Sequence, residues 1–243
     1  MTEPGSLAPQ NLAAVAAVAG APALAGGHAI TLAGETVVLL PQHALWWPAQ
    51  AALFIADLHL GKAATFRALG IPVPAGTTAG NLAQLTEMLA ALPVRRLVVL
   101  GDFLHAAQAQ TPAVLHALAL WRSRHAALQI TLVRGNHDSH AGDPPAALGI
   151  EIVDEPWRMG PFSACHHPQG DAPRHVLAGH VHPAVVLRGR GRDALRLPCF
   201  AVHAGFTLLP AFGLFTGAAT LSPEPGCRLY AVGGGRVWAV PPR

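Results

Sequence analysis

The sequence predicts an α/β fold whose parallel strands bring polar residues to one edge of a sheet. Three apolar runs, residues 51–56, 96–100 and 128–133, predict buried strands. Between them, residues 78–92 and 112–125 have apolar side chains at helical spacing. Strand, helix, strand, helix, strand is the pattern of parallel βαβ units, whose strands end at a common edge. Ligands of open α/β sheets bind outside that edge.

Shorter apolar runs predict further strands on both sides of this unit. Upstream, residues 28–32 and 36–40 flank a Gly-containing turn, and downstream strands are expected at 161–165, 175–178, 184–187, 194–200 and 236–240. Residues 64–76 are predicted to be a surface loop or lid. Residues 1–27 are rich in Ala and almost uncharged, so we expect a poorly ordered tail before a single domain at 28–243.

The composition fits a soluble protein with a sizeable core. Of the 243 residues, 51% are hydrophobic and 12% are charged, and the formal net charge of +3 is compatible with a phosphate-bearing partner without requiring one. The three cysteines have no zinc-knuckle or redox spacing, which favours a reduced compartment. A basic amino-terminal segment before an apolar run is absent, and so is the stretch of ~20 apolar residues that a membrane helix needs. We therefore expect a cytoplasmic protein without a membrane partner.

Clusters of potential metal ligands follow the predicted strands. Asp57 and His59 come after the first strand and are two residues apart, so both point to the same side of an extended segment. Asp102 follows the second strand after a glycine. The third strand ends in Gly135-Asn136-His137-Asp138, where a glycine permits a sharp turn before three polar side chains.

Two more clusters lie downstream. His166-His167 follows the strand at 161–165, and Gly179-His180-Val181-His182 repeats the two-residue spacing. The ligand set is Asp57, His59, Asp102, Asn136, His137, His166, His180 and His182. It is too large for one tetrahedral zinc, but it suits two divalent ions ~3.5–4 Å apart that share a carboxylate, as in phosphate-ester hydrolysis. Mixed oxygen and nitrogen ligands suit Mn²⁺, Fe or Zn²⁺.

In this order and spacing, the clusters resemble the motifs of calcineurin-like metallophosphoesterases. The resemblance implies a four-layer αββα metallophosphoesterase sandwich with two central mixed sheets. It also implies a first metal held by Asp57, His59 and His182, a second held by Asn136, His166 and His180, and Asp102 as the bridge. His166 is chosen over His167 because the family's ligand usually lies two residues before the proline. His137 is then free to protonate the leaving oxygen, and Asp138 is expected to orient it.

Other stretches are similar to the ligase-associated DNA damage response endonucleases. They are Asp57-Leu58-His59-Leu60-Gly61-Lys62, Phe66-Arg67, Gly70-Ile71-Pro72-Val73-Pro74, Leu197-Pro198-Cys199-Phe200, Leu209-Pro210-Ala211-Phe212-Gly213 and Phe215-Thr216-Gly217. This resemblance, over residues 36–240, implies a Mn²⁺-dependent single-strand DNA endonuclease of DNA repair, associated in function with a DNA ligase, an exonuclease and a helicase. Two alternatives stay open: a phosphodiesterase or phosphatase of small molecules, and a non-catalytic scaffold stabilised by metal.

Basic and aromatic residues supply candidates for substrate binding. Lys62, Arg67 and Arg134 are expected to contact phosphates near the metals. The basic turn at residues 188–196 either contacts DNA or is an ordinary exposed turn, and the sequence favours neither. Phe66, Phe103 and Trp157 are candidates for stacking on unpaired bases, although we favour apolar packing for each. His105, His140, His167 and His203 are candidates for lining the pocket, with structural or surface roles favoured.

Overall fold

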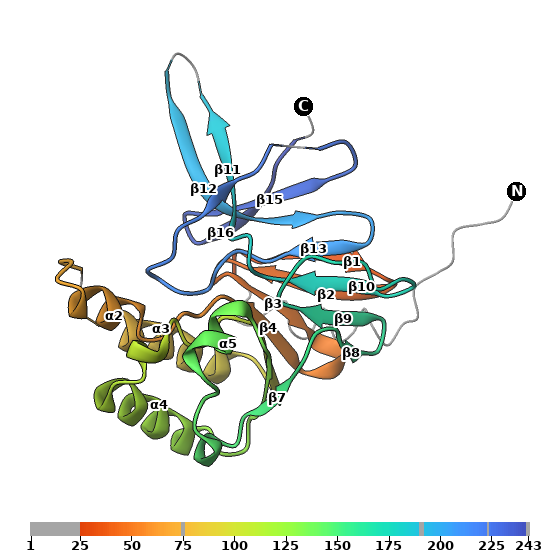
Figure 1. Cartoon of the computed structure of the whole chain (residues 1–243). Coiled ribbons are helices and arrows are strands. Elements are labelled where there is room, and N and C mark those ends of the chain that lie inside the picture. The colour runs from red at the N-terminus through yellow and green to blue at the C-terminus, as the bar shows by residue number, and fades with distance from the viewer. Residues whose placement is uncertain (1–24, 74–75, 190–191, 223, 242–243) are drawn as a thin grey trace, which may run out of the picture.

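The computed structural model describes residues 25–73, 76–189, 192–222 and 224–241, and it is a sandwich of two sheets with helices against one of them (Figure 1). The first sheet holds seven strands in chain order: β1 (His28–Leu32), β2 (Glu35–Leu40), β3 (Ala44–Trp47), β4 (Ala52–Ala56), β5 (Arg96–Leu100), β6 (Gln129–Val133) and β7 (Glu151–Val153). β1 to β4 pair antiparallel, whereas β4 to β7 pair parallel. The predicted parallel unit is therefore confirmed, within a mixed sheet.

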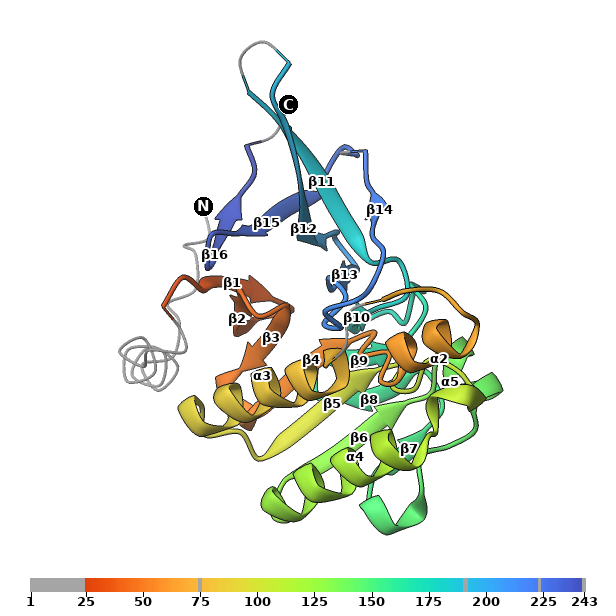
Figure 2. The same ribbon diagram turned by 90° about the vertical axis from the view of Figure 1, so that its left-hand side faces the viewer.

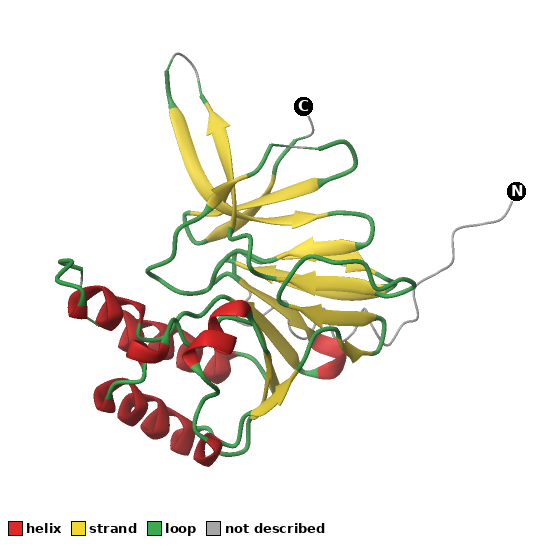
Figure 3. Cartoon of the chain, in the orientation of Figure 1, coloured by secondary structure: helices red, strands yellow, loops and turns green. Residues whose placement is uncertain are grey.

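The helices of the described chain lie on the outer face of this sheet (Figure 3). They are α2 (Lys62–Ala68), α3 (Thr77–Ala91), α4 (Pro112–Arg124) and α5 (Asn136–Ala141), with the 3-10 turns η2 (Pro48–Gln50), η3 (Ala107–Ala109) and η4 (Ala146–Leu148). α4 begins at a proline after Thr111, whose hydroxyl accepts the backbone N–H of Val114 at 3.3 Å. α3 buries Leu82, Leu85 and Met88 in the core between helices and sheet. No helix in the described part of the chain is long and apolar enough to cross a membrane.

The second sheet is built by the other half of the chain. Its strands are β8 (Trp157–Met159), β9 (Phe162–Cys165), β10 (His175–Ala178), β11 (Pro183–Arg188), β12 (Ala194–Val202), β13 (Phe206–Leu208), β14 (Ala219–Thr220), β15 (Arg228–Gly233) and β16 (Arg236–Ala239). Alternate residues face the first sheet: Leu177, Phe200 and Tyr230 belong to the core between the sheets. The predicted sandwich with two mixed sheets is confirmed.

The outer face of the second sheet is covered without helices in the residues described. Its apolar side chains, among them Val176 and Cys199, pack under Leu187, Leu221 and Val240. Leu187 belongs to β11 of the same sheet, whereas Leu221 and Val240 lie in the segments after β14 and β16. Side chains of the sheet and its connecting segments therefore cover the face on which the four-layer arrangement expects helices. Short connections, such as the one from β9 to β10, leave little chain for a helix.

Two predicted connections differ from the structure. Part of the loop predicted at 64–76 is the helix α2, whose alanines and arginine favour a helix. The helix lies against η3. The approach is close, since a Cβ on Gly61, the residue before α2, would lie 2.5 Å from the Cβ of Ala109. The turn predicted at Asn136 is instead the first turn of α5. Residues 74–75 of the predicted lid and 1–24 of the predicted tail lie outside the described residues. Residues 25–27 of that tail are described, and there the carbonyl of Gly26 accepts the N–H of Val237 at 2.8 Å.

Candidate metal centre

The predicted ligands lie together where strands of both sheets end, and their backbone is unusual. Five of them have positive φ angles in the left-handed region: Asp57 (54°), His59 (45°), Asp102 (52°), His180 (67°) and His182 (51°). A residue with a side chain pays about 1–2 kcal/mol for this conformation. Such strain concentrates at functional sites because the surrounding fold must hold it. Its occurrence at five predicted ligands supports a site that the fold is built to form.

The first group of ligands is Asp57, His59 and His182. One ligand atom of each lies within 4.8 Å of the others. The fully buried carboxylate of Asp57 accepts the backbone N–H of His180 at 3.1 and 3.0 Å, and it lies 3.3 Å from Nε2 of His182. The Nδ1–H of His182 donates to the carbonyl of Gly217 at 3.0 Å. A backbone carbonyl that fixes one ring nitrogen and leaves the other free is the usual setting of a metal-binding histidine.

Nε2 of His59 is the clearest sign that this group fits a metal. The side chain is buried, and this nitrogen has no hydrogen-bond partner among the described residues. Burial, followed by the charge of Lys62, lowers the pKa of His59 to about 2, so its imidazole is neutral. An unpaired nitrogen in a buried site is costly unless something binds it. A divalent cation satisfies it.

The second group converges on Nε2 of His166. This atom lies 2.8 Å from Oδ1 of Asn136, 3.1 Å from Nδ1 of His180 and 3.5 Å from Oδ1 of Asp102. Two ligands that share an ion at about 2.1 Å lie about 3.0–3.4 Å apart for right-angled to tetrahedral arrangements. The distance to His180 lies in this range and the other two lie just outside it, so the group is close to the spacing that one ion requires. The Nδ1–H of His166 donates to the carbonyl of Leu100 at 3.1 Å, which directs Nε2 into the site.

Asp102 lies between the two groups. Its Oδ2 is 3.6 Å from Nε2 of His59, and its Oδ1 is 3.5 Å from Nε2 of His166. Burial, and then the nearby charge of Asp57, raises the pKa of Asp102. One carboxylate oxygen of Asp57 lies within 4.8 Å of one of Asp102. Two buried carboxylates at this distance need positive charge nearby to stay ionised, and bound cations would provide it. Asp102 therefore lies where two ions, one held by each group, would share its carboxylate.

The choice of His166 over its neighbour agrees with the geometry. His167 also lies near the second group, since one ligand atom each of His166, His167 and His180 lies within 4.8 Å of the others. Its Nδ1, however, is 2.7 Å from Oε1 of Glu155, and its side chain is 43% exposed. The other oxygen of Glu155 accepts the backbone N–H groups of His166 and His167 at 2.7 and 2.9 Å. Glu155 thus holds the backbone that carries the ligand.

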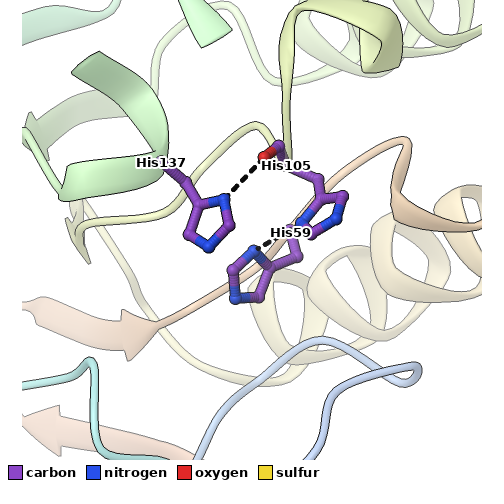
Figure 4. A group of neighbouring side chains, drawn as sticks. All are labelled: His59, His105 and His137. Atoms are coloured by element: carbon purple, nitrogen blue, oxygen red, sulfur yellow. Dashed lines mark hydrogen bonds between the residues drawn. The ribbon is translucent and has the colours of Figure 1, made fainter. Parts of the chain in front are cut away.

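His137 is oriented by a different group from the one expected. Its Nδ1–H donates to the backbone carbonyl of His105 at 2.7 Å, which leaves Nε2 directed toward the site, 3.9 Å from Oδ2 of Asp102 (Figure 4). Asp138 does not contact this ring. The carboxylate of Asp138 accepts N–H groups of the backbone instead, from Phe103 at 2.9 Å, Leu104 at 3.2 Å and Gly135 at 3.0 Å. The prediction that Asp138 orients His137 is therefore wrong.

Two glycines of the motifs make room for ligands. A Cβ on Gly101 would lie 2.1 Å from Nδ1 of His166, and the φ of Gly101 is +75°. A Cβ on Gly135 would lie 2.5 Å from Oδ1 of Asp102. Gly135 itself is extended, with φ −98° and ψ 177°. It is needed for space and not for the sharp turn that the sequence suggested.

The predicted phosphate contacts have different surroundings. Lys62 is half-buried at the start of α2. Burial lowers its pKa, and the charges of Asp102 and Asp57 oppose this effect by raising it, so Lys62 lies at the site. Arg67 is in the last turn of the same helix. Arg134 is committed elsewhere, since its guanidinium pairs with Asp143 at 2.9 Å and Asp154 at 2.7 Å. The structure thus shows Arg134 in two ion pairs, and its contact with phosphate stays a prediction.

The basic turn lies on the hairpin of β11 and β12, which projects from the body (Figures 1 and 2). Arg188 and Arg192 are exposed, and Arg196 donates to the carbonyl of Ala218. Arg190 lies outside the described residues. The other candidate histidines are dispersed: His203 stacks on Phe206, and Nδ1 of His140 lies near the carbonyl of Asn136.

His105 is the residue whose place at the site the sequence did not establish. Its Nδ1 lies 3.4 Å from Nδ1 of His59, and its ring stacks on that of His137 with centroids 5.0 Å apart (Figure 4). The signal that could have found it is its position three residues after Asp102, in the loop that follows the same strand.

Comparisons with known proteins agree with this geometry. Residues 52–165 match the family described as calcineurin-like phosphoesterase. The crystal structure of Pseudomonas putida nuclease MPE is similar, with 47% identity and a TM-score of 0.78, over 88% of this chain and 100% of that one. A protein of unknown function from Aquifex aeolicus, AQ665, is 18% identical over 58% of this chain and 82% of that one, with a TM-score of 0.37, too low to carry an argument. No curated protein matches the chain.

Three observations point to metal-dependent hydrolysis of phosphoester bonds. They are the motifs, the two ligand groups around one buried carboxylate, and the extent of the similarity. The chain belongs to the calcineurin-like phosphoesterase family.

Proposed function

We propose that the protein is a Mn²⁺-dependent endonuclease that cuts single-stranded DNA during repair. The observation that carries the proposal is the place of Asp102, whose two oxygens lie 3.6 and 3.5 Å from histidines of different ligand groups. One carboxylate shared by two groups of ligands is the arrangement that phosphodiester hydrolysis uses. The similarity to a nuclease of Pseudomonas putida supports a nucleic acid as the substrate.

Two divalent ions held by these residues would neutralise phosphoryl charge and lower the pKa of water for in-line attack. The chain supplies the rest. Lys62 adds positive charge beside the carboxylates, and His137 presents Nε2 toward the centre. Because Nδ1–H of His137 is held by the carbonyl of His105, a protonated ring gives up its proton from Nε2. The residue is thereby suited to protonate the departing oxygen.

The biological setting follows from the subgroup that the chain resembles. We propose a cytoplasmic protein that acts with a DNA ligase, an exonuclease and a helicase. Mixed carboxylate, amide and imidazole ligands are compatible with Mn²⁺, and they also accept Fe or Zn²⁺. Comparing Mn²⁺, Mg²⁺, Fe²⁺ and Zn²⁺ in one assay identifies the ion that supports cleavage.

Nicking of a circular single-stranded DNA by Mn²⁺-loaded protein tests the proposal. The wild type and a Glu87→Gln control, whose side chain is exposed on α3, are expected to nick the circle. Asp102→Asn and His137→Ala are expected not to. If the wild type leaves the circle intact but hydrolyses a small aryl or cyclic phosphodiester, the substrate is a small molecule. Two bound ions without turnover of any phosphoester would support the scaffold alternative.

A further inference from the structure

The wall of the site beside His137 is aromatic. The ring of His105 stacks on that of His137, and the ring of Phe66 lies 6.0 Å from His105. Phe215, from the loop after β13, meets Phe66 edge to face at 5.8 Å. Because the two phenyl rings are perpendicular, at 89°, at least one face of each is left uncovered by the other. An unbroken series of rings thus leads from the candidate proton donor to the surface of the protein.

This wall continues into an exposed apolar rim. Leu69 is 72% exposed, Ile71 44% and Leu214 58%, which makes three of the six most exposed large hydrophobic side chains in the described residues. They flank the two phenyl rings: the N–H of Ile71 donates to the carbonyl of Phe66 at 3.0 Å, and Leu214 precedes Phe215. Exposed apolar side chains next to both phenyl rings in the chain are consistent with a binding surface there.

The neighbouring charges indicate what binds there. Lys62 and Arg67 are on the same helix as Phe66, and Lys62 lies close to the metal ligands. Because His105 adjoins both His59 and His137, a ligand that places a phosphate at the metal centre can place a group attached to that phosphate along this wall. In nucleic acid, those groups are a deoxyribose and a base. Flat rings beside positive charge are the combination that binds unpaired bases, since every base has a face to stack.

We infer that Phe66, Phe215 and His105 form a stacking wall for an unpaired base next to the scissile phosphate. This inference rests on the proposed endonuclease function and explains a preference for single strands, because a base paired and stacked within a duplex cannot reach a side chain in this way. The other two stacking candidates from the sequence do not take part. Phe103 is buried beneath the helices, and Trp157 packs against the core between the sheets.

The test compares two single-stranded oligomers of equal length, one of thymidylates and one in which every sugar lacks its base. Alanine substitution at a stacking side chain costs about 1–3 kcal/mol per base, which is roughly 5- to 160-fold in binding. The wild type is expected to cleave the thymidylate oligomer with a kcat/KM higher by about this factor. Phe66→Ala and Phe215→Ala are expected to lose the preference and to cleave the abasic oligomer as the wild type does.

Matched variants separate stacking from folding. Phe66→Trp keeps a flat ring and is expected to keep the preference, whereas Phe66→Leu keeps apolar volume and is expected to lose it. Trp238→Ala removes an aromatic side chain that is 52% exposed on β16, away from α2 in both views, and is expected to change nothing (Figures 1 and 2).

Two results would overturn the inference while the nuclease stands: equal cleavage of both oligomers by the wild type, or an equal loss on both in Phe66→Leu. Cleavage of neither oligomer by Mn²⁺-loaded wild type would overturn the proposed function and the stacking wall with it.

Discussion

The backbone N–H of His137 donates to Oδ1 of Asp102 at 3.0 Å. The carboxylate that lies between the two ligand groups therefore also fixes the start of the helix that carries the candidate proton donor. A single hydrogen bond links the position of the metals to the position of the leaving group. His137 cannot move away from Asp102 without breaking this hydrogen bond. A hydrogen bond to a buried carboxylate is among the stronger ones in proteins.

Replacing His137 by alanine should affect substrates according to their leaving groups. General acid catalysis contributes about 100- to 10,000-fold, so cleavage of DNA should fall within that range. An aryl phosphodiester, whose phenolate leaves without protonation, should lose much less. Steady-state rates on both substrates give the comparison. An equal loss on both would exclude the role of proton donor.

Asp138→Asn should reduce stability and leave this selectivity unchanged. The carboxylate accepts three backbone N–H groups, and an amide in its place turns an N–H toward at least one of them. Leaving a buried donor without a partner costs about 1–3 kcal/mol, which chemical denaturation measures. The ratio of DNA cleavage to aryl ester hydrolysis should stay near that of the wild type, because His105 orients His137. A ratio that falls as in His137→Ala would restore the role predicted from the sequence.

Gly101→Ala should weaken the second metal site as well as the fold. The added Cβ would lie 2.1 Å from Nδ1 of His166. Gly34→Ala is the matched control, since Gly34 has a similar φ of +82° but no described atom within 4 Å of an added Cβ. Both variants should lose about 1–2 kcal/mol to the left-handed backbone. Titration with Mn²⁺ should show a loss of affinity in Gly101→Ala alone, and equal affinity in the two variants would contradict the steric argument.

The metal-free protein should lose stability on mild acidification. Burial, followed by the charge of Lys62, lowers the pKa of His59 to about 2 and that of His105 to about 4, from 6.5. Because the folded pKa values are depressed, the unfolded chain binds more protons below pH 6.5. Stability is therefore complete above about pH 6.5 and falls as the pH drops toward the folded values.

Urea unfolding of chelated protein between about pH 8 and pH 5 measures this dependence. His105→Asn should make the pH dependence shallower by at most one proton. A stability that stays flat or rises as the pH falls would show that these histidines are not neutral in the folded chain.

Much of the site was visible in the sequence because its ligands are local in the chain. Asp57 and His59, or His180 and His182, stand two residues apart after a strand, and parallel pairing of β4, β5 and β6 brings separate strand ends together. The periodicity of residues 78–92 likewise gave α3 to within one residue at each end. Such features depend on short-range pattern and on general rules of sheet topology.

What the sequence did not reveal depends on contacts between distant residues. Asp138 stands beside His137 in the chain, yet its carboxylate accepts N–H groups from Phe103 and Leu104 in another loop. Arg134 lies next to the glycine of its motif, but it pairs with Asp143 and Asp154. In each case, the partner of the side chain comes from a distant part of the chain. Spacing along the sequence does not indicate which distant groups will form these hydrogen bonds.

The most direct test of the account is whether Asp102 bridges two metal ions. A crystal of Mn²⁺-loaded protein, measured at the manganese absorption edge, should give two anomalous peaks per chain about 3.5–4 Å apart. One oxygen of Asp102 should contact each peak, with His59 beside the first and His166 beside the second. A single peak per chain, or two peaks of which Asp102 contacts only one, would contradict the dinuclear centre on which the proposed function depends.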